Sequence, residues 1–208
     1  MLVPVGDQAP RRGFPFVTHL IILANVGIYF YLVLSLGGEG YARVVGAHGL
    51  TPARWQLLQF LTSMFLHAGL VHLIGNILFL KIAGDNVEGR LGHVGFVFFY
   101  VACGVVGGMV HMVSAPGSTI PCIGASGAIS GVLGAFVVFF PTSPVRLALI
   151  IWPIKLPSWL AIGGWLTLQV MMARQQMQGE PTQVAVWAHI GGFAAGFLVA
   201  LWVRLRSR

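Results

Sequence analysis

A serine and a histidine lie in different apolar segments of this chain, each accompanied by glycines at helical spacing. These residues are Ser126 with Gly127, Gly131 and Gly134, and His189 with Gly192 and Gly196. Two glycine-lined helices can approach until their backbones nearly touch. An imidazole within about 2.6 to 3.2 Å of a serine hydroxyl can then take its proton. The pattern predicts nucleophilic catalysis, with Ser126 as nucleophile and His189 as general base.

Two more polar residues suit the stabilisation of an oxyanion. His72 and Asn76 are four positions apart, about 40° in projection at 100° per residue, and so share one helix face. The His72 ring N–H, the Asn76 amide and the backbone N–H of Ser126 can each donate to a tetrahedral oxyanion, at about 2.7 to 4 kcal/mol per donor. A zinc site from His67 and His72 is disfavoured because five residues separate them by about 140°, unlike the i, i+4 pair of helical zinc sites. We predict no metal and no other cofactor.

The elements that must position these residues are membrane helices. The 208 residues are 57% hydrophobic and only 8% charged, with a mean hydropathy of +0.85. Soluble domains carry about 25% charged residues, and disordered chains are polar and poor in aromatics. Despite the net charge of +7, Lys and Arg do not cluster as they do in nucleic-acid-binding proteins. The composition predicts an all-α integral membrane protein with no nucleic-acid partner.

Six apolar segments are bounded by charged or turn residues. They cover residues 14–36, 65–82, 94–113, 124–140, 159–172 and 184–203. A helix needs roughly 20 residues to cross a bilayer core, so the fourth and fifth segments are short. The fifth could begin earlier, because Pro153 and Pro157 interrupt an apolar stretch that starts at Leu147. We predict a single domain over residues 1–208, with the apolar connection 37–64 folded against the membrane on the outer side.

Lysine and arginine are distributed unequally between the two sides of this arrangement. With the N-terminus inside, the inner side holds Arg11, Arg12, Lys81, Arg90, Arg146, Lys155, Arg204, Arg206 and Arg208. The outer side holds Arg43, Arg54 and Arg174. Cytoplasmic connections keep the positive excess, so both termini are predicted to be cytoplasmic. Ser126 and His189 then lie at similar depth, about a turn and a half below the outer surface.

The five acids of the chain are poorly placed to orient His189. Asp7, Asp85 and Glu88 fall on the inner side, and Glu39 and Glu180 fall in outer connections. A Ser-His dyad is therefore favoured over a triad. Asp85 and Glu88, with Arg90, are most simply read as an inner-face cap and ion pair.

Structural alternatives exist for each candidate. A serine in a membrane helix often bonds the carbonyl four residues earlier, and glycine rows are often only packing devices. His67 and His111 suit anchoring at the membrane interface. A channel or transporter would distribute ionisable groups through the bilayer depth, whereas the candidates above cluster on one side.

At these residues the chain resembles the rhomboid family of intramembrane serine proteases. Gly124-Ala125-Ser126-Gly127 is similar to the family's nucleophile motif, and Ala188-His189 with the following glycines is similar to its base motif. His67, His72 and Asn76 match the spacing of its second-helix motif, and Glu88-Gly89-Arg90 its inner-loop Glu-x-Arg. The resemblance covers nearly the whole chain in the basic six-helix form. It implies the roles assigned above, with Gly124 supporting the oxyanion site.

The resemblance also implies the substrate, namely transmembrane segments of other membrane proteins cleaved near their outer ends. We expect a small wet cavity that opens outward, and movement of the fifth span or the outer loops to admit substrate. A catalytically silent relative that only binds transmembrane helices is the alternative. The expected location is a prokaryotic plasma membrane, and the oligomeric state is left open. One departure concerns Ser130, which stands where some members have an aromatic shelf under the histidine, so the sequence leaves open what supports His189.

Overall fold

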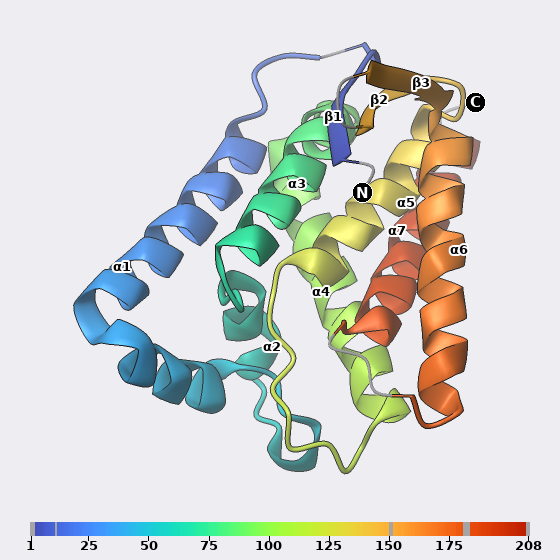
Figure 1. Ribbon diagram of the computed structural model, residues 1–208. Helices are drawn as coiled ribbons and strands as arrows, with labels where there is room; N and C mark the ends of the chain where they lie inside the picture. Colours follow the sequence, from blue (N-terminus) through green and yellow to red (C-terminus); the bar gives the residue numbers. More distant parts are fainter. Residues whose placement is uncertain (1–2, 11, 150–151, 181–183, 207–208) are drawn as a thin grey trace.

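Helices dominate the computed structural model, which describes residues 3–10, 12–149, 152–180 and 184–206 (Figure 1). Within these ranges the long helices are α1 (Phe16–His48), α3 (Leu70–Leu91), α4 (His93–Ser114), α5 (Ser126–Phe139), α6 (Ser158–Met177) and α7 (Val186–Arg206). Each predicted apolar segment lies on one of these helices, although the ends differ by several residues. The second segment was predicted to start at residue 65, whereas α3 begins after Gly69. His67 therefore precedes the helix.

Among the described residues, α1, α3, α4 and α7 are long and apolar enough to cross a membrane, judged by length and composition. The fourteen residues of α5 span about 21 Å at 1.5 Å per residue, less than a hydrocarbon core of about 30 Å. The twenty residues of α6 include Thr167, Gln169 and a polar C-terminal end. The chain is thus a helical integral membrane protein, and the number of crossings stays a prediction.

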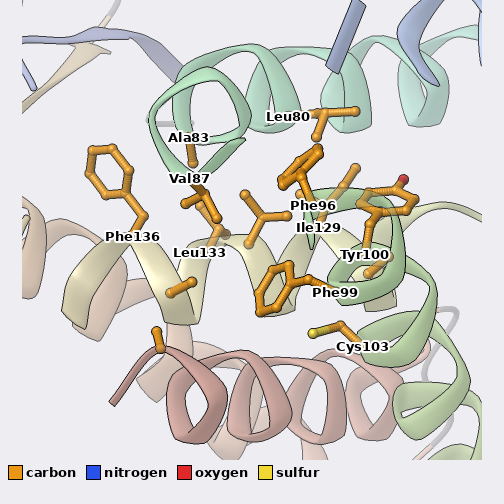
Figure 2. Packing of buried hydrophobic residues seen from close by; sticks show 14 of the residues in the cluster. Leu80, Ala83, Val87, Phe96, Phe99, Tyr100, Cys103, Ile129, Leu133 and Phe136 are labelled. Carbon is orange, nitrogen blue, oxygen red and sulfur yellow. The ribbon is translucent and has the colours of Figure 1, made fainter. Parts of the chain in front are cut away.

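Helix α5 forms the centre of the bundle. Twelve of its fourteen residues are buried, because α3, α4 and α7 pack around it. Figure 2 shows this core, formed by Leu80, Ala83 and Val87 of α3, by Phe96, Phe99, Tyr100 and Cys103 of α4, and by Ile129, Leu133 and Phe136 of α5. Only four of the twenty residues of α6 are buried. Helix α5, which begins at Ser126, is therefore enclosed by its neighbours. Helix α6 lies at the periphery of the bundle (Figure 1).

The connection between the first two predicted spans contains more helix than an irregular loop would. Helix α1 bends sharply at Gly37, whose φ of 63° and ψ of −175° belong to a region that glycine enters without strain. A second helical part of α1 then runs from this kink to His48. It is followed by three short elements, η1 (Pro52–Arg54), α2 (Gln59–Thr62) and η2 (Ser63–Phe65). These elements lead the chain back beneath α3 (Figure 1).

Glu88, near the end of α3, caps the N-terminus of α1. Its carboxylate accepts hydrogen bonds from the backbone N–H groups of Val17 (2.9 Å) and Thr18 (2.7 Å) and from the Thr18 hydroxyl (2.6 Å). An anion is favoured at a helix N-terminus, where N–H groups lack intrahelical partners. His93 Nδ1 lies 2.6 Å from the same carboxylate. Arg90 instead places its guanidinium over the Phe139 ring at 5.2 Å.

A small antiparallel sheet corrects the prediction of an all-α chain. Strand β1 (Val3–Asp7) pairs with β2 (Pro144–Leu149), which pairs with β3 (Trp152–Pro157). The prolines at both ends of the 144–157 segment oppose helix, so α6 starts only at Ser158 and not near Leu147. Cross-strand partners include Arg146 and Lys155. The sheet covers the end of the bundle where α7 finishes (Figure 1).

Candidate active site

Ser126 is the first residue of α5, and Gly124 shapes the turn that leads into it. Gly124 has a φ of 120°, a conformation that favours glycine, and its N–H donates to the carbonyl of Ser63 at 2.9 Å. A Cβ at this position would lie 2.8 Å from Cε1 and Nε2 of the His72 ring. Gly124 is therefore required both by the backbone and by the place that His72 occupies.

His189 projects from the first turns of α7 toward Ser126. Its Nε2 lies 2.8 Å from Ser126 Oγ, within hydrogen-bond reach. The histidine is only 9% exposed, whereas Ser126 is partly exposed. The structure thus brings together the hydroxyl and the imidazole that the sequence analysis paired.

The glycine rows of α5 and α7 form one seam between the two helices. A Cβ on Gly192 would collide with the carbonyl oxygen of Gly127, and a Cβ on Gly196 with that of Gly131. The same holds for Gly134, whose Cβ would lie 2.5 Å from the Phe193 carbonyl oxygen. Backbone therefore meets backbone along the seam, and this contact sets the separation of Ser126 and His189.

His72 and Asn76 face the turn before Ser126 from α3. Nδ1 of His72 accepts a hydrogen bond from the Ala68 N–H at 3.3 Å, so in the neutral ring the proton is on Nε2, the atom beside Gly124. Asn76 is 8% exposed, and its Nδ2 is buried without a hydrogen-bond partner. The first N–H groups of α5 are also free of intrahelical acceptors, as in any helix. Three kinds of donor therefore converge where an oxyanion would form next to Ser126.

Two residues of α6, which the sequence analysis did not single out, complete the surroundings of His189. Gln169 Oε1 lies 2.7 Å from His189 Nδ1, and the Trp165 ring centroid lies 5.9 Å from that of His189 with an interplanar angle of 36°. Ser130 does not support the histidine, because its hydroxyl donates to the carbonyl of Ser126 at 2.6 Å. A glutamine within an apolar helix is a recognisable signal, since polar groups in such segments are costly.

The remaining histidine of the second-helix pattern lies behind His72. His67 is fully buried, and its ring meets that of His72 edge to face, with centroids 5.2 Å apart. Burial lowers the pKa of His67 to about 4, so the ring is neutral at neutral pH. The Tyr41 hydroxyl donates to its carbonyl at 2.6 Å. His67 therefore packs behind His72 in the interior of the protein.

Comparison with known proteins assigns the chain to a family. The sequence model of the Rhomboid domain matches residues 54–206, about three quarters of the chain. The chain belongs to the rhomboid family. The matched region contains the second-helix histidines and asparagine, Ser126, His189, Gln169 and both helices of the glycine seam. Of the contacts described for the site, the one from Tyr41 lies outside it.

Individual relatives of this rhomboid chain carry two kinds of name. Rhomboid protease GluP of Bacillus subtilis (strain 168) is 34% identical over 131 residues, 61% of this chain and 25% of that protein. Putative rhomboid protease YdcA of the same organism is 28% identical over 126 residues, 61% of this chain and 63% of that protein. RHOMBOID-like protein 1 of Arabidopsis thaliana is 31% identical over 175 residues, 84% of this chain and 40% of that protein. The chain spans less than two thirds of each of these relatives.

Proposed function

We propose that this rhomboid is an intramembrane serine endopeptidase that cleaves transmembrane segments near the outer face of the membrane. The single observation that carries the proposal is the 2.8 Å contact between Ser126 Oγ and His189 Nε2. The family supports it, since two of the relatives are named as proteases. The natural location is a prokaryotic plasma membrane, with residues 1–208 forming one six-span domain, both termini in the cytoplasm and residues 37–64 on the outer side.

The chemistry follows from the tautomer of His189. Gln169 Oε1 can only accept a hydrogen bond, so Nδ1 carries the ring proton and Nε2 presents a lone pair to Ser126. Ser126 Oγ attacks the scissile carbonyl carbon while its proton passes to Nε2. The new oxyanion accepts hydrogen bonds from His72 Nε2–H, Asn76 Nδ2–H and the Ser126 backbone N–H.

The second half of the reaction returns the proton. As the C–N bond breaks, His189 donates its Nε2 proton to the leaving amine, and an acyl group remains on Ser126. Water then attacks the acyl carbon, and His189 takes the water proton and gives it back to Ser126 Oγ. Partial exposure of Ser126 supports access of water to this step. A substrate helix must loosen before attack, so Gly, Pro or small polar residues near the scissile bond favour cleavage.

Reconstitution with a generic single-span substrate tests the proposal. The purified wild-type protein in lipid vesicles should cut this substrate, whereas the Ser126→Ala and His189→Ala variants should not. A fluorophosphonate probe should label the wild type and fail to label Ser126→Ala. Ser130→Ala is the matched control, since the Ser130 hydroxyl bonds the backbone and not His189. Equal cleavage by wild type and Ser126→Ala would rule out the serine mechanism.

The alternative is a catalytically silent rhomboid that binds transmembrane helices. A silent protein would bind the same single-span peptide without cutting it, and fluorophosphonate would not label Ser126. Two observations favour the enzyme: the contact between Ser126 and His189, and the Asn76 Nδ2 group that has no hydrogen-bond partner. A protein that only binds helices requires neither of them.

A further inference from the structure

Helix α6 contributes the polar contact that orients the base. Gln169 is 7% exposed, and its Oε1 lies 2.7 Å from His189 Nδ1 in a buried hydrogen bond. A polar side chain on an otherwise apolar helix face is expensive unless it is paired. In this case the partner is the nitrogen of His189 that does not face Ser126.

Trp165 adds an aromatic contact from one turn earlier on the same helix. Its ring lies 5.9 Å from the His189 ring and 6.4 Å from that of Phe193 on α7. On α5, the hydroxyl of Ser130 donates to the backbone carbonyl of Ser126 and not to His189. The aromatic cover of the imidazole therefore comes from α6 and not from the helix that carries the nucleophile.

We infer that Gln169 is the positioning residue for His189, and that Trp165 covers the ring in place of an aromatic residue at position 130. The inference rests on the proposed function and deepens it. Gln169 fixes the tautomer with Nδ1–H, and its bond to that N–H strengthens as the ring becomes charged, because a hydrogen bond to an ionised group is stronger. A neutral amide thus takes the orienting role for which the chain has no suitably placed acid.

The inference links catalysis to the position of α6. Only four residues of α6 are buried, and an apolar cavity lies between it and α3, lined among others by Phe79, Ile82, Ala161 and Ile162. Helix α6 is therefore loosely held by the bundle, and its movement is one of the two routes expected from the sequence for the entry of a substrate. Any displacement that separates α6 from α7 also separates Gln169 from His189, so the base is fully oriented only after α6 has returned.

Solid-state nitrogen NMR of histidine-labelled protein in vesicles tests the positioning directly. The His189 signal, assigned by its loss in His189→Ala, should show a protonated Nδ1 in the wild type. Gln169→Leu removes the acceptor at similar volume and should yield a mixture of tautomers. Thr167→Val, on an exposed part of α6 where the hydroxyl bonds only the Gly163 carbonyl, is the matched control and should leave the signal unchanged.

Kinetics supplies the second readout. Gln169→Leu should lower kcat by about 10- to 1,000-fold, a part of the 10²- to 10⁴-fold that a general base contributes, with KM nearly unchanged. Gln169→Glu restores an acceptor and should recover kcat to within about tenfold of wild type, while the acidic limb of its pH–rate profile moves upward by about one unit or more. The other ionisable groups that act on His189 are His72 and His111, which these variants leave intact.

The outcomes separate the two proposals. Gln169→Leu with wild-type kcat and wild-type tautomer would overturn the positioning role while leaving the protease intact. No turnover by wild-type protein, together with a tautomer that changes in Gln169→Leu, would overturn the protease and keep the positioning. If Gln169→Leu misfolds, judged by gel filtration and thermal unfolding, Gln169→Glu decides, because a profile identical to wild type contradicts the inference.

Discussion

Gly192 of α7 lies against the carbonyl oxygen of Gly127 of α5, with no space for a side chain between them. Ser126 precedes Gly127 by a single residue, and His189 precedes Gly192 by three. The closeness of the two backbones is therefore what permits the 2.8 Å contact between Ser126 and His189.

Gly192→Ala should abolish cleavage. The added methyl overlaps the Gly127 carbonyl, so the helices must separate, at about 1 to 3 kcal/mol of stability. We expect at least a hundredfold loss of kcat/KM and a lower temperature of unfolding. Gly164→Ala, where a Cβ meets no atom within 4 Å, is the control and should keep full activity. A Gly192→Ala protein that cleaves at the wild-type rate would refute the role of the seam.

Removing an oxyanion donor should slow the chemical step and spare binding. His72→Ala and Asn76→Ala should each lower kcat by about 10²- to 10³-fold, the usual effect of losing one such donor, with KM little changed. Steady-state kinetics on the single-span substrate measures both values. Val71→Ala, a change on the exposed face of α3, should have no effect. Raised KM at constant kcat would instead assign His72 or Asn76 to substrate binding.

Glu88→Ala should reduce the stability of the fold but leave the reactivity of Ser126 unchanged. Its loss leaves the Val17 and Thr18 N–H groups without acceptors, and hydrogen bonds to a charged group contribute about 1.5 to 3 kcal/mol each. Thermal unfolding in detergent should therefore shift downward by several degrees. The protein that remains folded should label with fluorophosphonate like the wild type. Lost labelling at unchanged stability would show that the cap acts on the active site.

Acid should destabilise the protein partly through His67. The pKa of this buried ring is lowered to about 4, below the ordinary value near 6.5, so the unfolded chain binds the proton more readily. The contribution of the neutral His67 ring to the free energy of unfolding is complete above about pH 6.5 and is lost as the pH drops toward 4. His67→Phe should flatten the dependence of the unfolding temperature on pH in this window. An identical slope in wild type and His67→Phe would contradict a neutral, buried His67.

Short-range patterns made much of the site predictable. The pairing of Ser126 with His189 followed from polar groups in apolar segments and from glycines three or four residues apart, which are local signals. The β-sheet was not foreseen, because β1 and β2 pair residues such as Val3 and Ala148 that no local pattern connects. The end of the first predicted span at residue 36 agrees with the non-helical backbone at Gly37, but the helical structure that follows within the 37–64 connection was not predicted.

The support of His189 was left open for a different reason. Which neighbour touches an imidazole depends on how α6 is rotated against α7, and α6 has few buried residues to reveal that rotation in its sequence pattern. Gln169 was nevertheless visible as a polar residue within an apolar helix. The rule that selected His72 and Ser126 would have selected it as well.

In the proposed protease, the length of α5 would set where along a substrate the cut falls. Its C-terminal end is marked by cationic side chains, since Arg204 donates to the Val138 carbonyl at 2.6 Å and Arg90 covers Phe139, and such groups settle at the edge of the hydrocarbon. Measured from that edge, about 21 Å of helix in a core of about 30 Å puts Ser126 roughly 9 Å short of the opposite edge. A target helix would thus be severed about six residues inside its outer boundary, and adding or deleting one turn of α5 would shift the scissile bond by a comparable step.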